Sequence, residues 1–204
     1  TYYCGDKPHQ GGCCIMKEWQ ILLMHQILFQ GMFFAKNIIL QKNIEKPIRG
    51  KNPEAMASVA FFVLFISLSF YLSLTLTPVP AIAFSGPVFM KAAGVFLLIV
   101  NLVISAFSLV HMKDSWRVGV LKDQETKLVT SGIYKVTRNP YFVSYLLMFF
   151  AYALLLKSLL LFGLSGVGAL FIHLMVKKEE NYLAAVHGKV YARYKQSIPR
   201  YLLF

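Results

Sequence analysis

The residues best suited to chemistry lie in two polar segments that are far apart in the chain. The first, KLVTSGIYKVTRNPYFVSY, begins at Lys127 and carries Arg138 shortly before Pro140. The second carries the adjacent carboxylates of Glu179 and Glu180. A cation with free helix amides in one segment and two carboxylates in the other could together hold a zwitterionic group.

The sequence Asn139-Pro140 predicts the start of a helix. Proline is tolerated at the first helical position, and asparagine is a good N-cap. The first-turn amides would attract an anion, Arg138 adds a fixed cation, and Tyr134 and Tyr141 offer flat rings for stacking. The alternative interpretation is an ordinary helix cap with an arginine and tyrosines at a membrane surface.

Composition indicates the elements that must position these residues. Of 204 residues, 57% are hydrophobic and 15% are charged, which is typical of an integral membrane protein rather than a soluble domain. The sequence therefore predicts an all-α polytopic membrane protein, with one domain over residues 16–204. Five apolar stretches approach the length of a membrane span: Trp19–Phe34, Ala57–Thr77, Val88–Val110, Pro140–Leu156 and Ser158–Val176. The last two should form a hairpin that turns at Lys157-Ser158.

The net charge of +12 follows the predicted membrane topology, and we expect no nucleic-acid partner. Lysine and arginine follow the first, third and fifth apolar stretches and are scarce in the other loops. By the positive-inside rule, Lys42, Lys122 and the C-terminus lie in the cytoplasm, whereas the N-terminus and Lys157 lie outside. The remaining positive charge suits contact with anionic lipids.

Residues 1–15 differ from the rest of the chain. They contain all three cysteines, Cys4, Cys13 and Cys14, and Met16 resembles a natural start. The spacing of these cysteines matches no standard zinc pattern, so we predict an extension and no metal site.

Polar side chains within the apolar stretches are expected to pack helices together. Gln26 and Gln30 share one helical face with i, i+4 spacing, next to His25, and Asn101 and Ser105 have the same spacing in the third stretch. Hydrogen bonds between helices are the favoured role, with ligand binding as the alternative.

Two cytoplasmic segments are expected to form a cofactor pocket. One is the loop before the fourth span, and the other is an amphipathic helix after the fifth. Leu183, Val186, Val190 and Tyr194 lie on one face of that helix, which should be interrupted near Gly188. S-adenosylmethionine has both a zwitterionic amino-acid group and an adenine that can stack. The alternative for Glu179 and Glu180 is simple pairing with Lys177, Lys178 or Arg138.

These two segments resemble the isoprenylcysteine carboxyl methyltransferase superfamily, which includes the phospholipid methyltransferases. The family pattern is Gly-x-Tyr, Arg-His-Pro or Arg-Asn-Pro, a hydrophobic hairpin, Glu-Glu and Gly-x-x-Tyr-x-x-Tyr. Roughly the last 80 residues match it, with Gly132, Tyr134, Arg138 to Tyr141, Glu179, Glu180, Gly188, Tyr191 and Tyr194.

The resemblance implies a five-span enzyme with a cytoplasm-facing site for S-adenosylmethionine. Glu179 would hold the amino group of the cofactor, and the other cofactor residues implied are Leu128, Val129, Tyr134, Asn139, Pro140, Tyr141 and Phe142. Three positions depart from the family: Asn139 replaces the commoner histidine, Phe142 a tyrosine, and Met175 an arginine that holds the substrate carboxylate.

The expected reaction is methyl transfer to a lipophilic acceptor at the membrane interface. Among possible methyl acceptors, a carboxylate like that of isoprenylcysteine is slightly favoured over a phospholipid amine or a small thiol. Arg138, His173 or Lys177 would replace the arginine missing at Met175, and Glu180 is the candidate base, so Arg138 and Glu180 are the predicted catalytic residues.

Two other functions remain open from the sequence. The architecture also resembles the C-terminal domain of steroid 5α-reductases, which use NADPH, but Pro140-Tyr-Phe-Val-Ser-Tyr145 does not match their Pro-Asn-Tyr-x-Gly-Glu signature. A non-enzymatic scaffold or small transporter would be expected to show intramembrane charges or broken helices.

Overall fold

A computed structural model describes residues 16–43, 53–75, 87–112 and 128–202. Within these residues the chain is all-helical, as the sequence predicts. The elements are α1 (Glu18–Asn43), α2 (Pro53–Leu74), α3 (Pro87–Met112), the short 3-10 helix η2 (Gly132–Lys135), α4 (Pro140–Leu155) and α5 (Leu159–Ser197).

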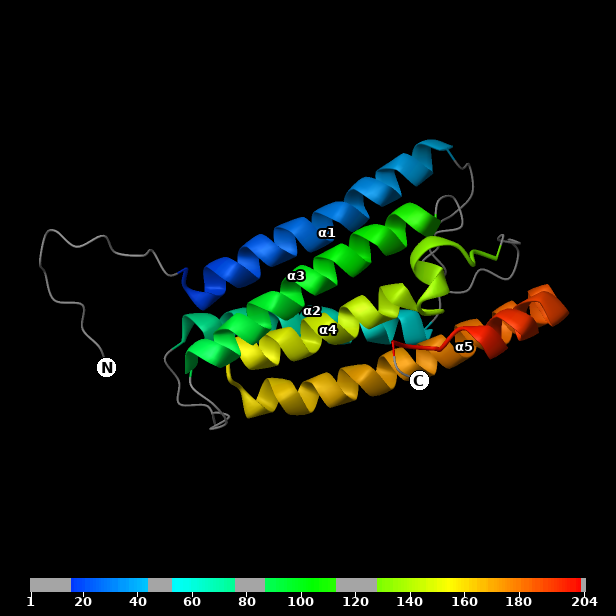
Figure 1. Ribbon diagram of the computed structural model, residues 1–204. Helices are drawn as coiled ribbons and strands as arrows, with labels where there is room; N and C mark the ends of the chain where they lie inside the picture. Colours follow the sequence, from blue (N-terminus) through cyan, green and yellow to red (C-terminus); the bar gives the residue numbers. More distant parts are fainter. Residues whose placement is uncertain (1–15, 44–52, 76–86, 113–127, 203–204) are drawn as a thin grey trace, which may run out of the picture.

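The α-helices run alternately up and down in one bundle (Figure 1). The ends of α1 and α3, the element η2 and the start of α4 all lie at one end of this bundle, which we call the site end. Helix α3 packs along α4 at very short range. A Cβ on Gly94 would lie 3.0 Å from the backbone nitrogen of Leu155 and 3.1 Å from the carbonyl oxygen of Ala151.

Three described helices are long and apolar enough to cross a membrane: α2, α3 and α5. Helix α4 is apolar but has only 16 residues. Helix α1 is long enough but carries several polar side chains. The chain is therefore a membrane protein with at least these three candidate spans, and the count of five spans remains a prediction.

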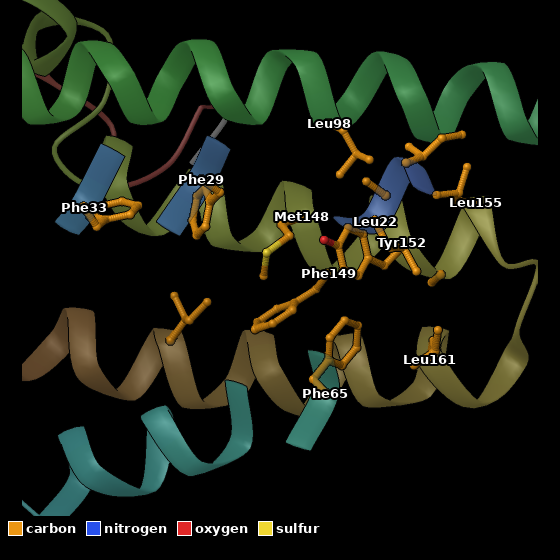
Figure 2. Close-up of a cluster of buried hydrophobic side chains, with 14 of the residues drawn as sticks. Leu22, Phe29, Phe33, Phe65, Leu98, Met148, Phe149, Tyr152, Leu155 and Leu161 are labelled. Atoms are coloured by element: carbon orange, nitrogen blue, oxygen red, sulfur yellow. The ribbon is translucent and has the colours of Figure 1, made fainter. Parts of the chain in front are cut away.

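Large side chains from all five α-helices form the core (Figure 2). Aromatic rings fill its centre at contact distance: the centroids of Phe65 and Phe149 are 4.7 Å apart, and those of Phe29 and Tyr145 are 5.3 Å apart. Such edge and tilted contacts add to the stabilisation from burial. The core thus fixes α4, which begins at the site end.

A buried hydrogen-bond network ties α1 to α3 and α4. Nε2 of His25 lies 2.9 Å from Oδ1 of Asn101, so Nε2 carries the proton and Nδ1 accepts from the hydroxyl of Tyr152 at 2.9 Å. The amide of Gln26 donates to the same hydroxyl at 2.8 Å, and that of Gln30 donates to Gln26 at 3.3 Å. The predicted packing role is confirmed for His25, Gln26 and Asn101, which bond between helices. The recorded bond of Gln30 lies within α1, and the buried hydroxyl of Ser105 has no partner among the described residues.

The turn between α4 and α5 lies where the sequence places it. Lys157 has a positive φ of 52°, and the hydroxyl of Ser158 accepts the backbone N–H of Leu161, which caps α5. The hairpin prediction is confirmed.

Helix α5 consists of two helical parts that meet at Gly188, the first continuing the fifth apolar stretch and the second folding back toward Glu180. It is interrupted at Gly188, with φ 48° and ψ −123°, as predicted. Of the predicted apolar face, Tyr194 is buried and Leu183 is half-buried, whereas Val186 and Val190 lie exposed on the protein surface, and Tyr191 is buried as well. The positive φ at Gly188, which glycine tolerates, lets the chain fold back at this point.

Some predictions fall outside the described residues or are untested. Residues 1–15, with the three cysteines, and Lys122 lie outside the described ranges. The assignment of residues 16–204 to one domain remains a prediction.

Candidate functional site

The loop before α4 is anchored by the turn that contains Gly132. This residue has φ +63°, and an added Cβ would collide with the imidazole ring of His111 at the end of α3. Glycine is therefore required here for both its conformation and its lack of a side chain. The turn places Tyr134, which is 5% exposed, so that its hydroxyl lies 3.2 Å from that of Ser108.

Helix α4 begins at Pro140, as predicted, with Asn139 at the N-cap position. The prediction that the Asn139 side chain caps the helix is wrong. Its amide donates instead to Oε1 of Glu180 at 3.4 Å and to the carbonyl of Arg200 at 3.2 Å. These two acceptors draw the side-chain amide away from the helix start. The backbone N–H of Asn139 donates to Oγ1 of Thr137.

Arg138, Glu180 and Arg200 form a cluster of one carboxylate between two guanidiniums. Nε and Nη2 of Arg138 donate to Oε1 of Glu180 at 3.2 and 2.9 Å. Nε and Nη2 of Arg200 donate to Oε1 and Oε2 of Glu180 at 3.1 and 2.8 Å. The side chains of Arg138 and Glu180 are only 7% and 4% exposed, so this arginine–glutamate cluster is buried.

The remaining nitrogen of Arg138 closes the end of α5. Nη1 donates to the carbonyls of Lys195 at 2.7 Å and Ile198 at 2.6 Å. The backbone N–H of Arg138 donates to the carbonyl of Pro199 at 3.0 Å. A cation here satisfies carbonyls at the negative end of the helix dipole. All three guanidinium nitrogens of Arg138 are thus engaged within the protein.

The two adjacent glutamates are in opposite electrostatic states. Burial favours a raised pKa for Glu180, but hydrogen bonds from Arg200 and Arg138 outweigh it and hold the pKa below the usual value. Burial, followed by the negative charge of Glu180, raises the pKa of the half-buried Glu179 to about 7. Within the described residues, no hydrogen bond or ion pair is recorded for the Glu179 carboxylate. Both lie beyond the apolar part of α5, which ends at Val176.

The hydroxyl of Tyr191 is another polar group without a recorded partner among the described residues. It is buried without a hydrogen-bond partner in the described part of the chain, and the side chain is 1% exposed. The pKa of Tyr191 is raised to about 12 by burial and then by the charge of Glu180, with Glu179 contributing too, so these groups are neighbours. A carboxylate and a hydroxyl without partners among the described residues, both close enough to Glu180 to feel its charge, fit a cationic group of a ligand.

The structure brings most of the other predicted site residues to the same end of the bundle. Leu128 and Val129 are half-buried just before η2. The carbonyl of Tyr134 accepts the hydroxyl of Tyr194 at 2.7 Å. Tyr141 and Phe142, by contrast, pack against the hydrophobic core, and the Tyr141 hydroxyl donates to that of Tyr145 at 3.1 Å.

Sequence reasoning missed the contribution of the C-terminal segment, residues 198–202. The chain reverses at the break in α5, so that the second part of α5 and this segment run back along its first part (Figure 1). The carbonyl of Arg200 accepts from Thr137 at 2.9 Å, and the hydroxyl of Tyr201 lies 3.2 Å from Nδ1 of His173. The sequence offered one signal. Glu179 and Glu180 are two carboxylates for which Arg138 was the one arginine considered, and Arg200 is a further arginine in the same C-terminal region.

A family model described as phospholipid methyltransferase matches residues 89–190, which is half of the chain. The match extends from α3 to the second part of α5 and includes the loop before α4 and both glutamates. A search of curated proteins found no match.

Proposed function

This chain belongs to the phospholipid methyltransferase family, and from that premise we propose that it transfers a methyl group from S-adenosylmethionine to an amine head group of a membrane lipid. The family is one of membrane methyltransferases, so the proposal concerns the cofactor, the acceptor and the residues that hold them.

The observation that carries the proposal is that the two adjacent glutamates have different partners. Glu180 is saturated by two arginines, whereas Glu179 has a carboxylate without a partner among the described residues. The α-ammonium of S-adenosylmethionine would bind Glu179, with the hydroxyl of Tyr191 as a further acceptor. Leu128, Val129 and Tyr134 would border the remainder of the cofactor, with Asn139 to Phe142 beneath it.

The acceptor proposed here differs from the one that the sequence placed first. A substrate carboxylate needs a cation, but Arg138 already donates from every guanidinium nitrogen within the protein. Two nitrogens of Arg200 donate to Glu180 as well. An amine acceptor needs no such partner, so the geometry favours a phospholipid amine over an isoprenylcysteine carboxylate.

The residues contribute chiefly by positioning. S-adenosylmethionine supplies a methyl group that is already activated by its sulfonium, so the reaction needs little covalent help. Holding two reactants in line can lower a barrier by about 7–11 kcal/mol. The arginine–glutamate cluster would do this indirectly by fixing the loop, the start of α4 and the end of α5 relative to Glu179.

The cofactor assignment is tested by calorimetry with S-adenosylhomocysteine on the purified protein. Glu179→Gln should weaken binding by about 1.5–3 kcal/mol, the range for a hydrogen bond to a charged group. Glu18→Gln, at the opposite end of the bundle, is the matched control and should bind like wild type. Unchanged affinity in Glu179→Gln, or binding of NADPH in place of S-adenosylhomocysteine, would refute the assignment.

The acceptor assignment is tested by comparing substrates in detergent micelles. Phosphatidylethanolamine should be methylated, whereas a short farnesylated cysteine should not. Methylation of the farnesylated cysteine alone would reject the amine acceptor and leave the cofactor site intact.

A further inference from the structure

An amine acceptor needs a base, and the glutamates do not supply one. At neutral pH an aliphatic amine resembling lysine, with a pKa of about 10, is almost entirely protonated and has no free electron pair. Glu180 is saturated by arginines, and Glu179 faces the proposed cofactor ammonium. Burial raises the pKa of Tyr134 to about 12, so its hydroxyl stays protonated.

His173 lies on the same side of α5 as Glu180, nearer the membrane. It precedes Glu180 by seven residues, which is two helical turns or about 10 Å along the axis. The C-terminal segment contacts α5 at both levels, because Arg200 pairs with Glu180 while the next residue, Tyr201, meets His173. His173 therefore belongs to the same assembly as the candidate cofactor site.

His173 is also beside the surface from which a lipid would arrive. It is half-buried, and its neighbours Leu170 and Leu174 are 59% and 56% exposed on a helix apolar enough to span a membrane. A lipid head group at the interface could reach this imidazole without entering the core.

The partner of Nδ1 determines what the imidazole can do. The Tyr201 hydroxyl lies 3.2 Å from Nδ1 of His173. Burial raises the pKa of Tyr201, so the hydroxyl stays neutral and can accept as well as donate. If Nδ1–H donates to Tyr201, then Nε2 keeps a free electron pair, and histidine is the side chain that exchanges protons most readily near neutral pH.

Building on the proposed function, we propose that His173 is the general base for the amine acceptor, with Tyr201 as the positioning residue that fixes its tautomer. The ammonium of the lipid gives one proton to Nε2 of His173. The freed electron pair forms the nitrogen–carbon bond to the methyl group, and the carbon–sulfur bond breaks with its electron pair left on sulfur. The imidazolium keeps its Nδ1–H bond to Tyr201 and then releases the Nε2 proton to water.

Kinetics of the His173→Gln variant test the base. General-base catalysis contributes about 10²–10⁴-fold, so kcat with phosphatidylethanolamine at pH 7 should fall by about 10²-fold or more. The rate should then recover about tenfold per pH unit as the solvent deprotonates the amine. Affinity for S-adenosylhomocysteine should be unchanged. His187→Gln, at the end of the first part of α5, is the matched control and should keep the wild-type rate.

The pH profile of the rate must come from His173 and not from other titratable groups on the elements around it. They are Tyr201 and Arg200 in the C-terminal segment, Lys177 and Glu180 on α5, and Tyr141 and Tyr145 on α4. Helix α2 adds only Tyr71, at its far end, between Met56 and Leu74. A Lys177→Gln variant should therefore keep the wild-type pH profile.

Nitrogen NMR of the His173 ring gives a readout that does not depend on turnover. We expect the Nδ1–H tautomer in the wild type and a mixture of tautomers in Tyr201→Phe. An Nε2–H tautomer in the wild type, or a His173→Gln variant as active as wild type, would overturn the inference. Failure of the proposed function would show separately in the wild-type protein. A protein that binds no S-adenosylhomocysteine would reject the cofactor site, and one that methylates no amine would reject both the amine acceptor and the base.

Discussion

At the scale of single residues, Glu179 and Glu180 are adjacent in sequence but have different environments. Successive residues on a helix point about 100° apart. Glu180 pairs with Arg138 and Arg200, whereas no ion pair is recorded for Glu179 among the described residues. The charge on Glu180 in turn helps to raise the pKa of Glu179. The pair therefore works as one structural and one ligand-binding group.

The raised pKa of Glu179 predicts a pH dependence for cofactor binding. With a pKa of about 7, set by burial and then by Glu180, the free protein increasingly holds this carboxyl protonated below pH 7. A bound ammonium requires the carboxylate, so binding must displace that proton. Affinity for S-adenosylhomocysteine should therefore fall as pH is lowered from 8 to 5, approaching about tenfold per unit below pH 7.

Calorimetry at several pH values checks this dependence. The Glu179→Gln variant, which has no carboxyl to titrate, is the control and should bind weakly with a much flatter pH profile. A wild-type affinity that is constant between pH 8 and pH 5 would contradict the assigned role.

Glu180 is predicted to matter for stability far more than Glu179. Glu180→Gln leaves Arg138 buried without its carboxylate, and breaking a buried ion pair from one side costs about 3–5 kcal/mol. The melting temperature in detergent should fall clearly for Glu180→Gln and little for Glu179→Gln. Equal melting temperatures for the two variants would show that the arginine–glutamate cluster does not hold the site together.

At the scale of elements, the site depends on how the loop before α4 meets α3 and the C-terminal segment. Gly132 lets the turn approach His111, and Tyr134 contacts Ser108 on α3. Residues 137–139 then donate to the backbone of the segment after α5. Polar contacts therefore hold these three separate elements together at this point.

Gly132 gives a test of this arrangement. Gly132→Ala places a side chain at a positive φ, which costs about 1–2 kcal/mol, and also forces His111 to move. We expect a lower melting temperature and weaker cofactor binding. Gly163→Ala, on an open face of α5, is the control and should be neutral or stabilising by about 0.5–1 kcal/mol. A harmless Gly132→Ala would mean that the turn can adopt another conformation.

At the scale of the whole molecule, the site end gathers elements from both halves of the chain. The end of α1 lies at this end, and the turn between α4 and α5 lies at the other (Figure 1). The buried network of His25, Asn101 and Tyr152 fixes α1 against the helices of the family match, although α1 itself lies outside that match.

This arrangement predicts accessibility from opposite sides of the membrane. In a cysteine-free chain that starts at Met16, a single cysteine at Lys42 or Lys122 should react with an impermeant reagent only from the cytoplasmic side. A cysteine at Lys157 should react only from the other side. Labelling of residues 42 and 157 from the same side would reject the topology.

The sequence by itself determined the helices and the residue types at the site. Apolar stretches, Pro140 and the turn at Lys157-Ser158 act locally, so the start of α4, the hairpin and the interruption at Gly188 could all be predicted. Only the tertiary structure decided which partners the polar groups choose. The side chain of Asn139 donates to Glu180 instead of capping α4, because competing acceptors decide its partner. The roles of Arg200 and Tyr201 depend on a chain reversal that brings the C-terminus back to α5, and no local pattern encodes those contacts.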